Sequence, residues 1–164
     1  MIAKAATISH GGNAVRYSVN KDKAEIVKVN FLPDDISAEA MFQRMVLKQK
    51  EFSSIINKGR PLKRNVIRME ISPTKEESAG WTLADWVRLA NEYIRVFDSI
   101  DLSKKAKRAS AKFTNVKNSQ YVVALHHDAK SGIPHLHIDV NRVDMDGGKS
   151  SVSCPLKPSD SAPL

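Results

Sequence analysis

The chain has 164 residues, 41% of them hydrophobic, so it is long enough to bury one core of ordinary size. It holds 26 Lys and Arg against 18 Asp and Glu, and the net charge of +8 favours a polyanionic partner, most often nucleic acid. A single cysteine excludes an internal disulfide, and no stretch is apolar enough for a signal peptide or a membrane span. We therefore expect a soluble cytoplasmic protein without membrane insertion.

The first part of the chain predicts strand, short helix, strand and long helix. Residues 2–8 (IAKAATI) form a short apolar strand, which SHGG ends. A short helix through AVRYSVN then leads to a strand through EIVKVNF. Apolar residues recur at helical spacing over about 37–57, with Ser37 as the N-cap and NKGRP as the stop.

The second part adds a strand, a helix and a hairpin. Residues 65–72 alternate in polarity, which predicts a half-buried strand. TLAD at 82–85 fits a capping box and opens an amphipathic helix to about residue 99. A basic connector over 101–120 precedes two β-rich runs, YVVALHHD and IPHLHIDVNRV, which a short polar loop joins into an antiparallel hairpin.

Histidines cluster in that hairpin: four of the chain's five fall within twelve residues, at 126, 127, 135 and 137. Because strand side chains alternate, His135 and His137 share one face with Asp139 and Asn141. Two imidazoles on one strand and a third on its neighbour predict a metal site with open coordination positions, as catalytic sites have. Alternation alone leaves open whether the third is His126 or His127.

The pattern HHD followed by PHLHI and an asparagine resembles the metal-binding motif of conjugative relaxases, the mobilisation nucleases of the HUH endonuclease superfamily. The resemblance implies His126, His135 and His137 as ligands, with His127 as the second choice for the third position. It also implies Mg²⁺ or Mn²⁺ as the working ion. On ligand softness, three imidazoles also suit Zn²⁺, Ni²⁺ or Co²⁺.

The stretch ISHGGNAVRYSVNKDKAEIV resembles the segment that carries the nucleophilic tyrosine of relaxases. This resemblance implies that Tyr17 attacks a DNA phosphate and forms a 5′-phosphotyrosine with a free 3′-hydroxyl. The other two tyrosines suit this role less well, because Tyr93 lies beside the apolar stripe of a helix and Tyr121 begins a strand.

Further residues have expected roles around this chemistry. Asp128 and Glu70 are the candidate carboxylates for orienting a histidine or accepting a proton. Asn141, on the histidine face, is expected to contact substrate. Two basic runs are expected to follow DNA phosphates: Lys104, Lys105, Lys107 and Arg108, and then Arg60, Lys63 and Arg64.

Together these features predict an α+β fold of the relaxase type, an antiparallel sheet with helices packed on one face. The domain is expected to span residues 1–147, shortened at its C-terminal end, with a flexible tail over 148–164. The expected function is metal-dependent, site- and strand-specific nicking of single-stranded or melted transfer-origin DNA. Accessory mobilisation proteins and a coupling protein are expected as further partners.

Two other functions are compatible with the sequence. One is a rolling-circle replication initiator or transposase of the same superfamily. Such enzymes usually place their tyrosine after the histidines, and here no tyrosine follows His137. The other is a basic DNA-binding protein without catalysis, which a Tyr17→Phe variant would distinguish.

Overall fold

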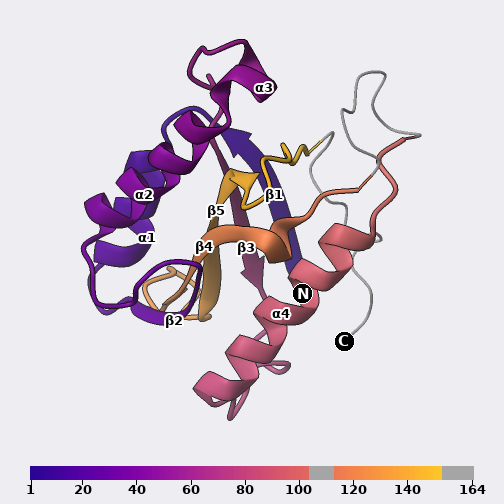
Figure 1. Cartoon of the computed structure of the whole chain (residues 1–164). Helices are drawn as coiled ribbons and strands as arrows, with labels where there is room; N and C mark the ends of the chain where they lie inside the picture. The colour runs from indigo at the N-terminus through magenta and orange to yellow at the C-terminus, as the bar shows by residue number, and fades with distance from the viewer. Residues whose placement is uncertain (104–112, 153–164) are drawn as a thin grey trace.

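A computed structural model describes residues 1–103 and 113–152 (Figure 1). In these residues an antiparallel sheet is combined with helices that follow its strands. The elements are β1 (Ile2–Ile8), α1 (Gly11–Asn20), β2 (Glu25–Asn30), α2 (Ala38–Glu51), α3 (Ser53–Asn57), β3 (Val66–Ser72), α4 (Leu83–Ser99), the 3₁₀ turn η1 (Val116–Asn118), β4 (Ser119–His126) and β5 (His135–Asp144).

The sheet has five strands in the order β1-β3-β5-β4-β2, and every neighbouring pair is antiparallel. The expected hairpin is therefore confirmed as β4 and β5, with β5 at the centre. All eight residues of β4 are buried, as a continuous apolar run in the interior of a sheet predicts. The α+β class with an antiparallel sheet is confirmed.

One face of the sheet is covered by α4. Leu89, Ile94 and Phe97 of this helix belong to the same buried cluster as Leu136 and Ile138 of β5. The capping box at the start of α4 is present, with Thr82 and Asp85 bonded reciprocally. The amphipathic stripe read from the sequence is thus the stripe that packs on the apolar face of β5.

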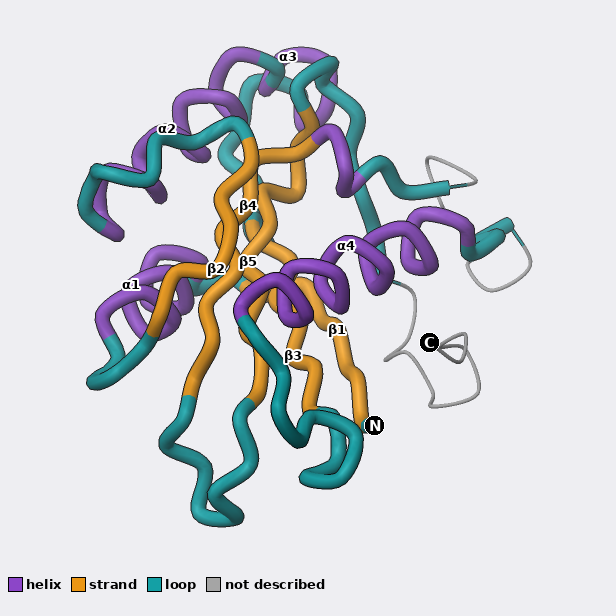
Figure 2. The backbone as a smooth tube through the Cα atoms, turned by 90° about the horizontal axis from the view of Figure 1, so that it is seen from below, coloured by secondary structure: helices purple, strands orange, loops and turns teal. Residues whose placement is uncertain are grey.

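The opposite face, which carries the histidines, is partly covered by α1 and α2. Met41 and Met45 of α2 pack with Val15 of α1, on Val66 and Val122 of the sheet. Figure 2 shows α4 on one side of the strands and α1 and α2 on the other. The expectation that the helices pack on one face of the sheet is corrected. α2 joins α1 on the histidine side, because Val66 and Val122 give it an apolar surface there.

Close packing at the start of α1 places this helix on β3. A Cβ on Gly11 would lie 2.4 Å from a methyl carbon of Val66 and 2.7 Å from Asn65 Oδ1. Only a glycine allows so close an approach. The SHGG segment that ends β1 therefore also determines the position of α1 on the sheet. Tyr17, which belongs to α1, is positioned with it.

The segment after β5 folds back on the strand. Lys149 forms an isolated bridge with Val143, and Ser150 is buried. Residues 153–164, the rest of the expected tail, lie outside the described residues. Among the helices of the described ranges, none combines the length and apolarity that crossing a bilayer requires.

Candidate metal centre and tyrosine site

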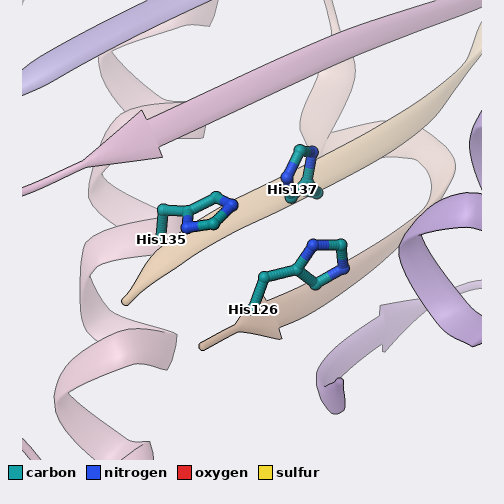
Figure 3. A group of neighbouring side chains, drawn as sticks. All are labelled: His126, His135 and His137. Carbon is teal, nitrogen blue, oxygen red and sulfur yellow. The ribbon is translucent and has the colours of Figure 1, made fainter. Parts of the chain in front are cut away.

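The pairing of β4 with β5 brings three histidines together. His126 lies directly opposite His135, and His137 pairs with Ala124 one step along the same face. One ring nitrogen from each of the three lies within 4.8 Å of those of the others. The ring centroids are 4.3 Å apart for His126 and His137, and 5.0 Å apart for His135 and His137. Figure 3 shows the three rings turned toward a common space.

The structure includes His126 in this group and leaves His127 outside it. His127 directs its Nε2 to Glu25 Oε2 at 2.9 Å, and its side chain is 41% exposed. His126 is buried. Strand register decides between the two histidines, because it places His126 across from His135. The side chain of His127 points to the opposite face of β4.

Hydrogen bonding leaves ring nitrogens in this group available as ligands. His126 Nε2 donates to the carbonyl oxygen of Ser18 at 2.8 Å, so its proton sits there and the lone pair of Nδ1 is free. Within the described ranges, His126 Nδ1 and His137 Nε2 are buried without a hydrogen-bond partner. Orphaned, buried imidazole nitrogens are the donor set that a divalent cation would satisfy.

Burial also keeps two of these rings neutral. Burial is the main cause that lowers the pKa of His126. It also lowers the pKa of His137 to about 3, and the neighbouring rings and Arg68 lower the pKa of His137 further. A neutral imidazole is the form that binds a metal. The three residues therefore fit a divalent cation in geometry, and His126 and His137 also fit it in protonation.

Two side chains from β3 compete for the other nitrogen of His137. Arg68 Nη2 lies 3.1 Å from His137 Nδ1, and Glu70 Oε1 lies 3.7 Å from the same atom. When Nδ1 carries the proton it faces the carboxylate, and when it does not it can accept from the guanidinium. Glu70, as expected from the polar face of its strand, thus borders the site, where it also pairs with Lys4 at 2.7 Å.

Tyr17 projects from α1 beside the histidines. Its ring centroid lies 5.5 Å from that of His126 and 5.6 Å from that of His137. The residue is 42% exposed, so the phenol is accessible from solvent. Tyr93 and Tyr121 are buried as expected, and burial raises the pKa of Tyr93. Of the three tyrosines, Tyr17 alone adjoins the imidazoles.

Two cations flank the Tyr17 ring. Lys21 Nζ lies 4.9 Å and Arg68 Cζ 5.0 Å from its centroid. Asp128, predicted to act at the site, bonds Lys21 through Oδ2 at 3.0 Å, and this contact lowers the pKa of Asp128. Asp128 therefore reaches the tyrosine through Lys21. In the described ranges no hydrogen bond joins Asp128 to an imidazole.

Asn141 has a different role from the one expected. It is 0% exposed, and its amide is fully bonded. Nδ2 donates to the carbonyl of Met45 at 3.1 Å and to Gln120 Oε1 at 3.0 Å, while Oδ1 accepts from Gln49 Nε2 at 2.9 Å. The expectation of a substrate contact is therefore wrong, because α2 covers this end of the histidine face and Asn141 fastens the helix to it.

Arg68, Lys21 and Asp139 had no expected role at this site from the sequence. Asp139 is 0% exposed. Neither of its carboxylate oxygens makes a hydrogen bond of normal geometry among the described residues, although the Ser18 side chain interacts with the carboxyl and partly offsets the effect of burial on its pKa. Burial raises the pKa of Asp139 to about 6. Alternation places Asp139 on the same strand face as His137. What the sequence lacked was the register that sets Arg68 across from Asp139.

The expected DNA-binding residues fall into two groups. Arg60, Lys63 and Arg64 line a basic cavity after α3, away from the histidines. Lys104, Lys105, Lys107 and Arg108 lie outside the described residues.

Comparison with known proteins gives one family. No curated protein matches the chain. The family described as relaxase, MobA/VirD2-like, nuclease domain, matches residues 17–155, which contain Tyr17, both strands of the histidine hairpin and all three converging imidazoles. Since the match covers most of the sequence, this chain belongs to the relaxase family and carries its MobA/VirD2-like nuclease domain.

Proposed function

We propose that the protein nicks and rejoins one strand of DNA at a transfer origin, using Tyr17 as the nucleophile and a divalent cation held by His126, His135 and His137. The observation that carries this proposal is the exposed Tyr17 ring, 5.5 and 5.6 Å from two of the three converging imidazoles. One phosphate could contact both the phenol and the histidine group. Single-stranded or locally melted DNA is the substrate, in the cytoplasm, where accessory mobilisation proteins and a coupling protein would act with the enzyme.

The histidines would supply the binding site for the cation. A bound divalent ion neutralises charge on the non-bridging oxygens of the scissile phosphate and favours attack at phosphorus. By relaxase resemblance the ion is Mg²⁺ or Mn²⁺, whereas three nitrogen donors also suit Zn²⁺ or Ni²⁺. The Ser18 carbonyl fixes the tautomer of His126, which is the usual task of the outer partner of a metal-binding histidine.

Tyr17 carries out the covalent step. Its phenol oxygen attacks the phosphorus, the bond from phosphorus to the 3′-oxygen breaks, and a 5′-phosphotyrosine forms. The phenol loses one proton and the departing 3′-oxygen gains one, so atoms and charge balance. Because one phosphoester replaces another, the step reverses and the strand can be rejoined.

Charged side chains around Tyr17 assist this step. The positive charges of Lys21 and Arg68 beside the Tyr17 ring would attract the negative phosphate of the substrate. Glu70, whose Oε1 lies 3.7 Å from His137 Nδ1, would orient His137 or accept the proton. Asp128 would hold Lys21 in place.

The experiment is a covalent-adduct assay with DNA. Labelled single-stranded oligonucleotides tiled across the DNA beside the gene are incubated with the protein and Mn²⁺, and adducts are detected on denaturing gels. We expect one oligonucleotide to give an adduct with the wild-type protein and with Tyr121→Phe, but none with Tyr17→Phe. Absence of a wild-type adduct would favour a DNA-binding protein without catalysis, and an adduct with Tyr17→Phe would exclude this nucleophile.

A further inference from the structure

A basic cavity lies at the end of the sheet away from the histidines. Its volume is about 500 Å³, and five cationic side chains line it: Arg60, Lys63, Arg64, Arg142 and Lys149. The first three belong to the loop between α3 and β3, and the other two to β5 and the segment after it. In Figure 1 this loop lies beside α3, away from the turn that joins β4 to β5.

The loop that forms the cavity is held in place by its own carbonyl groups. Asn57 Nδ2 donates to the carbonyls of Arg60 at 3.0 Å and Pro61 at 2.9 Å. Arg142 Nη1 donates to the carbonyl of Arg64 at 3.1 Å, while its Nε donates to Ser150 at 2.8 Å. Because these carbonyls are hydrogen-bonded within the protein, the loop backbone is fixed in place. The exposed side chains of the loop face solvent.

The cations of this cavity differ from two arginines on α4. Arg88 and Arg95 on α4 each pair with an acid three residues earlier, Asp85 and Glu92. Within the described parts of the chain, none of the five cavity cations forms an ion pair with an acid. Unpaired charges of one sign around a concave surface focus a positive potential, which attracts a polyanion.

The cavity lies at a fixed distance from the histidines, because β5 leads to both. Arg142 follows His137 by five residues, so the two positions are roughly 17 Å apart along the strand. One strand of B-form DNA advances about 3.4 Å per nucleotide. Because five is an odd offset, Arg142 and His137 point to opposite faces of β5, and α2 covers the histidine face at Asn141. A DNA chain bound at both places therefore follows a path longer than the strand and spans more than about five nucleotides.

From this arrangement we propose that the cavity binds the sugar-phosphate backbone of the substrate DNA at a distance from the cleavage position. The protein would then hold its substrate at two places, one for chemistry and one for anchoring. This inference deepens the proposed function and rests on DNA being the substrate. It does not depend on Tyr17 being the nucleophile.

Salt dependence of DNA binding tests the anchoring site. The full chain is titrated with a labelled single-stranded oligonucleotide and with the matching duplex, between about 50 and 200 mM salt, with a chelator present to prevent cleavage. The variant R60Q/K63Q/R64Q is compared with the wild type. The control R44Q/K50Q/K75Q removes the same charge from exposed positions outside the cavity.

We expect the cavity variant to bind more weakly, with a slope of log affinity against log salt that is shallower by roughly 2 for single strands or roughly 2.7 for duplex. The form of DNA that shows the change is the form that the cavity holds. Unchanged slopes for both forms, or an equal change in the control variant, would overturn the proposal. The adduct assay is a separate readout, so failure of the anchoring site and failure of the nuclease proposal are distinguishable.

Discussion

The two ends of β5 present polar side chains on the same face of the same strand, yet their environments are opposite. At one end Asn141 has every polar atom of its amide bonded, to α2, β4 and its own strand. At the other end, His137 Nε2 has no hydrogen-bond partner in the described ranges. Satisfied polar groups fix a fold, whereas unsatisfied buried ones require an explanation such as a ligand.

The covering helices account for this difference. α2 brings Gln49 and the Met45 carbonyl to Asn141. α1 brings to the histidines one carbonyl, that of Ser18, and an exposed phenol, that of Tyr17. The Asn141 end is therefore closed by protein, and the histidine end keeps donor atoms and a nucleophile for an external group.

The largest expected effect is at the histidine end. His126→Ala removes one of three proposed ligands and should lower adduct formation roughly 10³-fold, because a bound cation contributes several kcal/mol to phosphoryl chemistry and each 1.36 kcal/mol is tenfold in rate. Mn²⁺ affinity, measured by calorimetry, should fall with it. His127→Ala is the matched control and should change neither quantity, because His127 lies outside the group and pairs with Glu25 at the surface.

At the closed end, Asn141→Ala should reduce stability and leave the metal site intact. Removing the amide leaves buried partners such as Gln120 Oε1 unsatisfied, which we expect to lower the free energy of unfolding by about 3–4 kcal/mol. Denaturant unfolding measures this change. If Asn141→Ala left stability unchanged and weakened DNA binding, the structural role would be contradicted and the substrate contact expected from the sequence would be supported.

Asp139 lies between the two ends and gives a smaller, pH-dependent effect. Its folded pKa of about 6 exceeds its unfolded value of about 3.9, so the folded state binds the proton more tightly and wild-type stability falls as the pH rises between these values. Asp139→Asn removes this penalty. In chelator, we expect a gain of at most about 3 kcal/mol above pH 6 that disappears near pH 4.

Denaturant unfolding of both proteins across that pH range checks this prediction. The lowered histidine pKa values act equally on both proteins and cancel in the difference. A gain that is the same at every pH would mean that the Asp139 carboxyl does not titrate between these values.

Local patterns were enough to predict most of the fold. Alternation gave β3, apolar spacing gave α2 and α4, and the polar loop between two β-rich runs gave the β4–β5 hairpin. The same alternation placed His135 and His137 on one face. The side of the sheet on which α2 packs was not predictable, because it depends on contacts between segments far apart in the chain.

The candidate site could be predicted only in part, for a related reason. Clustering pointed to the histidines, but register decided between His126 and His127, and the covering helix decided that Asn141 is structural. Arg68 belonged to a polar strand face with nothing local to distinguish it. Its position beside Tyr17 and His137 follows from the pairing of β3 with β5 and the placement of α1.

The central claim is that three imidazoles bind one cation beside Tyr17. Anomalous scattering from a crystal soaked in Mn²⁺ tests it most directly. We predict a single strong peak about 2.0–2.3 Å from one nitrogen of each of His126, His135 and His137, a distance typical of imidazole bound to a first-row metal. No peak among the three rings, or a peak bound elsewhere while those rings stay unliganded, would contradict it.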